Sequence, residues 1–299
     1  MATRPVVAGV DGSEESLRAV EWAALAAHRH HAPLRIVSAP VLPPRMHARN
    51  ADPQTVADLL TAVSARALGT AVTRSEEVCP RLLIDTSLLA GAPALAVTAS
   101  GSGALMLVVG ARGAGGFAQM LLGSVSRYAA MHAACPVIVV REETSAVHRE
   151  VVVGVRDPLD ATAALDFAFD EAALRNATLV VVHSWNSLPA PSWRPADAER
   201  LAAETDRSLA EALEPWRAKY PGVPVRRDVV HGHPARVLSA YAGRADLVVI
   251  GRHSHGLAIG GIQHAVLSHA HGPVAIVPET VGVSDTTDVP DTMAASATG

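Results

Sequence analysis

One glycine-rich segment carries the residue types and the spacing that could bind a phosphate. Residues 110–116 read Gly-Ala-Arg-Gly-Ala-Gly-Gly, and Gly123-Ser124 follows with nine residues between Gly113 and Gly123. Glycines let the backbone turn tightly and present N–H groups to an anion without a Cβ in the way. A helix that begins at Gly123-Ser124 would add unpaired N–H donors, and Arg112 would add a positive charge. This combination predicts a phosphate cradle.

A second group of candidates follows the first expected strand. Gly9 allows close backbone approach there, and the carboxylate of Asp11 could accept hydrogen bonds from a ribose or an adenine. The segment at 110–124 is not a Walker A loop, which needs Gly-Lys-Ser/Thr, because the only lysine is Lys219. The candidate ligand-binding residues of this half are Gly9, Asp11, Gly110, Ala111, Arg112, Gly113, Ala114, Gly115, Gly116, Gly123, Ser124, Val125 and Ser126.

These candidates are positioned by apolar runs that alternate with alanine-rich stretches of helical spacing. Uninterrupted apolar runs are typical of parallel strands buried on both faces. Strands are expected at 5–10, 34–38, 82–89, 104–109 and 136–140, then at 150–155, 178–182, 224–230, 246–250 and 273–277. Helices are expected at 14–31, 53–69, 92–101 and 123–133, with others between the later strands. Such alternation predicts doubly wound parallel sheets, whose ligands bind at the carboxyl ends of the strands.

The chain also repeats itself. Residues 5–10 match 150–155, 19–23 match 164–168, 91–93 match 232–234, 107–110 match 248–251, and 135–139 match 272–276. Five blocks in the same order indicate a tandem duplication. We therefore expect one domain at 1–145, a second at 146–280, and a disordered acidic tail at 281–299.

The pattern Gly-x2-Gly-x9-Gly-Ser, together with Gly-Val-Asp-Gly-Ser after the first strand, resembles the signature of the universal stress protein family. The resemblance covers the chain as a tandem pair and leaves out only the tail. It implies two flavodoxin-like (Rossmann-like) domains that bind ATP, with or without Mg²⁺. Asp11 would lie near the adenosine, with residues 110–116 and 124–126 around the phosphates. Because family members commonly pair through their last strands, the resemblance also implies a pseudo-dimer along 136–140 and 273–277.

The second copy departs from this signature. Arg156 stands opposite Asp11, Ser254 replaces the second glycine, and the following loop is four residues shorter. The corresponding weaker candidates are Gly154, Gly251, Ser254, Gly260 and Gly261. We expect weak, altered or absent nucleotide binding in this copy. Seven histidines crowd its presumed binding edge and last helix, and a metal or pH-sensing role is the alternative to solvated side chains there.

Composition excludes several classes of function. The formal net charge is −4, which gives no reason to expect a nucleic-acid or membrane-surface binder. Two cysteines make neither a disulfide framework nor a four-ligand zinc site, and no apolar run reaches the roughly 18 residues of a membrane span. We expect a cytoplasmic protein.

Three functional hypotheses remain from the sequence. The first, implied by the resemblance, is a nucleotide-dependent stress regulator with little or no hydrolysis, whose ligand orders the loop at 110–122 for a regulatory partner or a homo-oligomer. The second is a slow ATPase or an enzyme that autophosphorylates Ser124 or Ser126. The third is an interaction scaffold with vestigial nucleotide binding. No Ser-His-Asp triad or paired-carboxylate pocket is evident, so binding is favoured over turnover.

Overall fold

The computed structural model describes residues 3–40, 52–113, 122–141, 147–186, 195–252 and 261–279. Within them, ten strands form one sheet in the order β3-β2-β1-β4-β5-β10-β9-β6-β7-β8. The first half contains β1 (Val6–Gly9), α1 (Glu14–Arg29), β2 (Leu34–Ser38), α2 (Pro53–Val78), β3 (Ile84–Leu88), α3 (Pro93–Ser100), β4 (Met106–Gly110), α4 (Ser124–His132) and β5 (Val137–Val140). The second contains β6 (Glu150–Gly154), η2 (Leu159–Ala161), α5 (Thr162–Arg175), β7 (Thr178–Trp185), α6 (Pro195–Ala212), α7 (Glu214–Lys219), β8 (Val225–His231), α8 (Pro234–Ala242), β9 (Leu247–Arg252), α9 (Gly261–His269) and β10 (Val274–Pro278).

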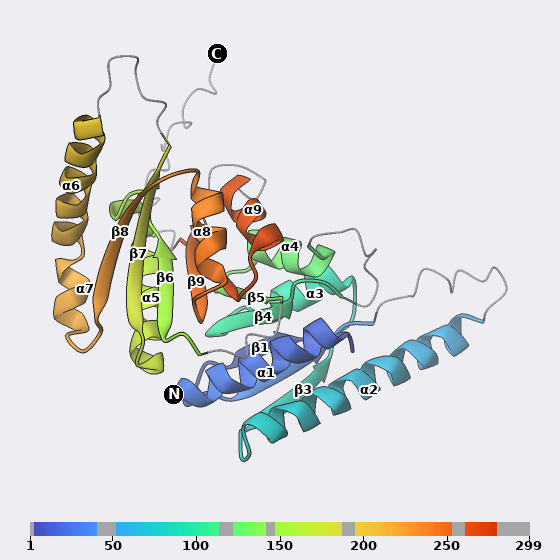
Figure 1. The fold of residues 1–299 in the computed structure, drawn as a ribbon. Coiled ribbons are helices and arrows are strands. Elements are labelled where there is room, and N and C mark those ends of the chain that lie inside the picture. The colour runs from blue at the N-terminus through green and yellow to red at the C-terminus, as the bar shows by residue number, and fades with distance from the viewer. Residues whose placement is uncertain are drawn as a thin grey trace, which may run out of the picture.

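Helices cover both faces of the sheet (Figure 1), which explains why its central strands are apolar throughout. In β1, Val6 and Ala8 pack into the core shared with α1, while Val7 packs into the opposite core with α3 and α4. The predicted doubly wound α/β fold is confirmed. In each half the strand order reverses beside the first strand, between β1 and β4 and between β6 and β9. These are the switch points at which such sheets bind ligands.

The two halves join through their last strands, as the resemblance implied. β5 and β10 pair antiparallel, with Val139 opposite Val274, while the other neighbouring strands run parallel. Each half also reaches a helix of the other. Arg252 donates a 2.8 Å hydrogen bond to the carbonyl oxygen of Ala133, just past α4. Arg141 donates one of 2.8 Å to the carbonyl oxygen of Leu267 in α9.

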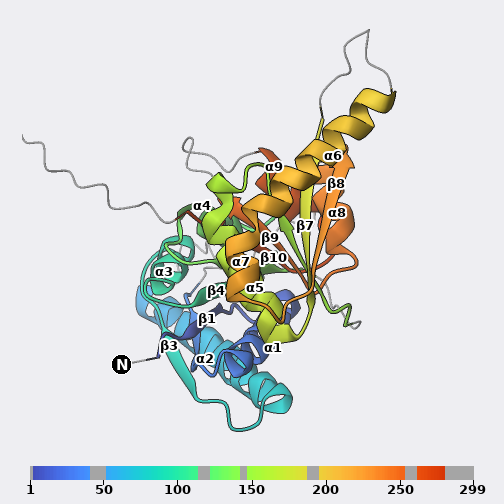
Figure 2. The ribbon, with the colours of Figure 1, turned by 90° about the vertical axis from the view of Figure 1, so that its left-hand side faces the viewer.

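Several predicted element bounds were wrong. The helix expected to stop at Gly69 continues to Val78, because its buried side persists through Ala71 and Ser75. The strands expected at 82–89 and 224–230 are β3 and β8, whose side chains are partly exposed because they form the two edges of the sheet. Figure 2 shows α6 alongside the β8 edge and α7 next to α5. The predicted domain boundary at 145 and the predicted tail at 281–299 lie outside the described residues.

One helix among the described residues, Gln54–Val78 of α2, is long and apolar enough to cross a membrane by length and composition alone. That is weak evidence, because a helix packed on a globular body passes the same test. α2 buries Ala67 and Ala71 against the α1 layer. Its Arg74 forms ion pairs of 2.9 Å and 2.6 Å with Glu14 and Glu21 of α1. α2 therefore packs on α1 at the surface of the first half.

Candidate functional site

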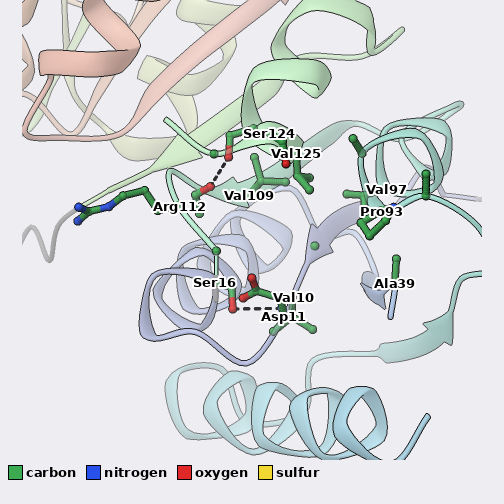
Figure 3. A pocket seen from close by; sticks show the side chains of 17 residues that line it. Val10, Asp11, Ser16, Ala39, Pro93, Val97, Val109, Arg112, Ser124 and Val125 are labelled. Carbon is green, nitrogen blue, oxygen red and sulfur yellow. Dashed lines mark hydrogen bonds between the residues drawn. The ribbon is translucent and has the colours of Figure 1, made fainter. Parts of the chain in front are cut away.

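A cavity of about 440 Å³ opens at the switch point of the first half, where β1 and β4 end (Figure 3). This volume falls in the range of small-molecule sites. Its walls come from the ends of both strands, the residue after β2, and the beginnings of α1, α3 and α4. The lining residues are Gly9, Val10, Asp11, Ser16, Ala39, Ala92, Pro93, Ala94, Val97, Val109, Gly110, Arg112, Gly113, Gly123, Ser124, Val125 and Ser126.

Asp11 is held in place by the first turn of α1. Its Oδ1 accepts hydrogen bonds from the backbone N–H of Ser13 at 3.0 Å and from the Ser13 hydroxyl at 2.6 Å. The Ser13 hydroxyl in turn accepts from the backbone N–H of Ser16, which caps α1. The sequence that places a serine at this N-cap therefore also fixes the carboxylate at the mouth of the cavity.

The glycines at the end of β4 are required by close packing. A Cβ on Gly110 would lie 2.9 Å from the carbonyl carbon and oxygen of Glu15, so α1 can approach β4 only because no side chain intervenes. A Cβ on Gly113 would overlap Oδ2 of Asp11. Gly113 and Asp11, 102 positions apart in sequence, are thus in direct contact beside the cavity.

α4 begins at Ser124, as predicted. Its N-cap residue is Gly123, which has no side chain to bond the first N–H groups of the helix. The backbone N–H of Gly123 donates to Ala111 at 2.7 Å and fixes the helix start against the end of β4. The Ser126 hydroxyl is buried and donates to the carbonyl of Gly110 at 2.6 Å. Because the first N–H groups of a helix carry partial positive charge, this helix start can accept an anion.

The opposite wall is apolar and was not identified from the sequence. It includes Ala39, Pro93 and Val97 (Figure 3), while Val10 and Val109 line the cavity at the ends of β1 and β4. Residues 91–93 stood out as a repeated block, and their place after the third strand is the signal that could have marked Pro93 as a wall residue. Ala39 and Val97 carry no such signal, since small apolar residues are common throughout the chain. This apolar wall faces the start of α4, which can accept an anion. Such a cavity suits a ligand with a flat apolar ring and a charged end.

Arg112 does not aim into the cavity. Figure 3 shows its guanidinium pointing away from the other labelled side chains. Glu15, which the sequence reasoning missed, holds it: the Arg112 backbone N–H donates to Oε2 of Glu15 at 2.7 Å, and Nε donates to Oε1 at 2.7 Å. In this arrangement the Glu15 carboxylate offsets the charge of Arg112, and a contact between Arg112 and a bound phosphate stays a prediction. Ala111 is buried behind the rim, and Ala114, Gly115 and Gly116 lie outside the described residues.

The corresponding place in the second half is built differently. Gly154 ends β6 against Leu238, whose Cδ1 would lie 2.8 Å from an added Cβ, where Gly9 faces the shorter Val97. Arg156, opposite Asp11 in the repeat, pairs with Asp160 at 3.3 Å on the surface. Gln263 donates to the carbonyl of Gly251 at 3.1 Å, as Ser126 does to Gly110.

The second half also has a helix that begins at this place. α9 begins at Gly261, the position matched to Ser124. Gly251 lies at the end of β9, as Gly110 does in β4. Ser254 and Gly260 lie outside the described residues. Within the described part of the chain, no group of three or more His, Cys, Asp or Glu side chains is placed to hold a metal ion.

The doubly wound sheet and the two joined copies define a tandem Rossmann-like protein, with a candidate small-molecule site at the switch point of its first half. A profile of the Universal stress protein family matches residues 2–141 and 148–278. Universal stress protein Rv2005c of Mycobacterium tuberculosis (strain ATCC 25618 / H37Rv) is 32% identical over 295 residues, covering 92% of this chain and 97% of its own. The chain belongs to the universal stress protein family.

A solved structure agrees with this fold. A universal stress protein from Archaeoglobus fulgidus DSM 4304 matches 93% of this chain and 97% of its own, with a TM-score of 0.69 and 18% sequence identity. A universal stress protein solved in complex with cAMP matches 48% of this chain and all of its own, with a TM-score of 0.35 and 30% identity.

Proposed function

We propose that this chain is a stress-response regulator that binds an adenine nucleotide in the cavity of its first half. ATP is the expected ligand, with little or no hydrolysis. The observation that carries the proposal is the two-sided cavity: an apolar wall that includes Val97 and Pro93 faces the uncapped start of α4. An adenine could pack on the wall while phosphates accept hydrogen bonds from the helix start and the Gly113 region. Asp11 would contact the ribose or the adenine.

Turnover is less well supported than binding. The Ser126 hydroxyl is buried and already donates to the carbonyl of Gly110, so it is not a free nucleophile in this arrangement. Of the carboxylates that line the cavity in the described residues, Asp11 is the one that could hold Mg²⁺, which would then arrive with the nucleotide. We propose weak or no binding in the second half, where Arg156 stands in place of Asp11 and the longer Leu238 stands in place of Val97.

The first test is to denature freshly purified protein and quantify the released nucleotide by chromatography, followed by calorimetric titration with ATP, ADP and AMP, with and without Mg²⁺. We expect about one equivalent of sites per chain. Two equivalents would show that the second half also binds. No released nucleotide and no calorimetric binding would overturn the proposal in favour of a scaffold.

Val97→Leu provides the matched variant, because it copies the Leu238 of the second half into the first. We expect it to weaken nucleotide binding at least tenfold by filling the apolar side of the cavity. Leu95→Ala on the same helix is the control, since Leu95 is exposed and does not line the cavity. Unchanged binding in Val97→Leu would place the ligand elsewhere.

A further inference from the structure

The contact between Glu15 and Arg112 occupies donors that a bound phosphate would otherwise use. Oε2 of Glu15 accepts from the backbone N–H of Arg112, and Oε1 lies 2.7 Å from Nε and 2.6 Å from Nη2. The Glu15 side chain is 13% exposed, against 43% for Arg112. The carboxylate is therefore largely enclosed between α1 and the end of β4. It holds the Arg112 side chain pointing away from the other labelled residues of the cavity (Figure 3).

This pairing decides the charge that a ligand meets. Among the described residues that line the cavity, Arg112 is the one cation and Asp11 the one anion. With Glu15 counted, the formal charge of the three groups is −1. A phosphate that reaches Arg112 must therefore displace a carboxylate that is already bound in two places, and each added phosphate charge increases the repulsion.

We propose that Glu15 is a specificity residue that lowers the affinity of this site for nucleoside triphosphates relative to nucleoside monophosphates. A single phosphate can be held by the neutral N–H groups at the start of α4, without Arg112. A triphosphate extends further and carries more negative charge, so it meets more repulsion from the Glu15 carboxylate, which also keeps Arg112 occupied. This inference rests on the proposed nucleotide site and adds which ligands that site selects.

The test compares the calorimetric Kd for ATP and for AMP, without Mg²⁺, in the wild type and in Glu15→Gln. The substitution keeps the length of the side chain and removes its charge. We expect ATP to bind about tenfold more tightly, with the Kd for AMP changed less than threefold. Glu14→Gln is the control: it makes the same change in net charge on the neighbouring residue, which pairs with Arg74 of α2 at 2.9 Å.

Two further variants separate release of the arginine from a general loss of negative charge. Arg112→Gln alone removes the cation and leaves the Glu15 carboxylate unneutralised, so ATP should bind at least about threefold more weakly, with a smaller change for AMP. In the double variant of Glu15→Gln and Arg112→Gln, the gain in ATP affinity should disappear. If the gain persists in the double variant, or if Arg112→Gln alone weakens the binding of ATP and AMP equally, the inference is overturned. The Arg112 result also decides the matter if Glu15→Gln does not fold.

Failure of this inference is distinguishable from failure of the proposed function. If the wild type and the variants bind neither nucleotide, the nucleotide site itself is refuted. If the wild type binds nucleotide but Glu15→Gln shifts the ATP to AMP ratio no more than Glu14→Gln does, the site stands and the role of Glu15 is refuted.

Discussion

Gly113→Ala tests whether contact between Asp11 and the loop after β4 shapes the binding site. A Cβ at position 113 would overlap Oδ2 of Asp11. The carboxylate would have to move by about 1 Å to restore an ordinary van der Waals separation. That movement strains the bonds that Oδ1 accepts from the N–H and hydroxyl of Ser13, at 3.0 Å and 2.6 Å. The backbone at Gly113 is not left-handed, so alanine adds no backbone strain there.

The expected effect falls on binding rather than on folding. Losing one well-placed hydrogen bond to a partly exposed carboxylate is worth about 1.4 kcal/mol, which corresponds to about a tenfold rise in Kd for the nucleotide. Isothermal titration calorimetry with ATP measures this directly, and thermal unfolding monitors stability. We expect stability to fall by no more than about 1 kcal/mol, because Asp11 can rotate into solvent.

Two other glycines complete this experiment. Gly110→Ala places a Cβ 2.9 Å from the backbone of Glu15, which cannot rotate away, so it should destabilise the fold by about 1–3 kcal/mol. Gly69→Ala, in an exposed part of α2 with no neighbour within 4 Å, should stabilise by about 1 kcal/mol and leave binding unchanged. A Gly113→Ala protein that binds ATP within twofold of the wild type would refute the role given to this contact.

Three further predictions follow from contacts away from the cavity. Burial alone would raise the pKa of Glu171, but the hydrogen bond from His30 and the charge of Arg175 outweigh it and hold that pKa below its ordinary value. This carboxylate therefore stabilises the fold above the unfolded pKa and stops doing so as pH falls through the folded one. In urea unfolding, the free energy of unfolding should fall more steeply between pH 7 and pH 3 in the wild type than in Glu171→Gln. At pH 7 the variant should be less stable by about 3 kcal/mol. Equal dependence of the two free energies on pH would contradict this. Burial raises the pKa of the Cys135 thiol to about 11, so it should resist a thiol reagent at pH 8 until the protein unfolds, and rapid labelling of the native protein would argue otherwise. Arg252→Ala removes the cation at the end of α4 and should weaken nucleotide binding about threefold. Arg141→Ala removes the equivalent contact on α9 and should leave nucleotide binding unchanged. Equal effects of the two substitutions would mean that both act only on the junction between the halves.

Much of this fold could be predicted because it depends on local signals. The apolar runs gave the strands, and the matched blocks gave two copies of one topology. The predicted bounds of helices and strands were wrong where tertiary packing outweighed a local signal. Gly69 weakens a helix but does not end it when the buried side continues to Ser75. The edge strands β3 and β8 read as buried because position in the sheet is not encoded in a short apolar run.

The sequence by itself determined the glycines at 110, 113 and 123, whose backbone freedom acts over a few residues, and the duplication, which is visible in the matched blocks. Only the tertiary structure decided what surrounds them. Val97 packs against Gly9 and lines the cavity, while the longer Leu238 packs against Gly154, and both side chains are far from these glycines in sequence. Glu15 meets Arg112 across 97 positions for the same reason. Such contacts depend on how α1, α3 and β4 pack together, and no local pattern specifies that packing.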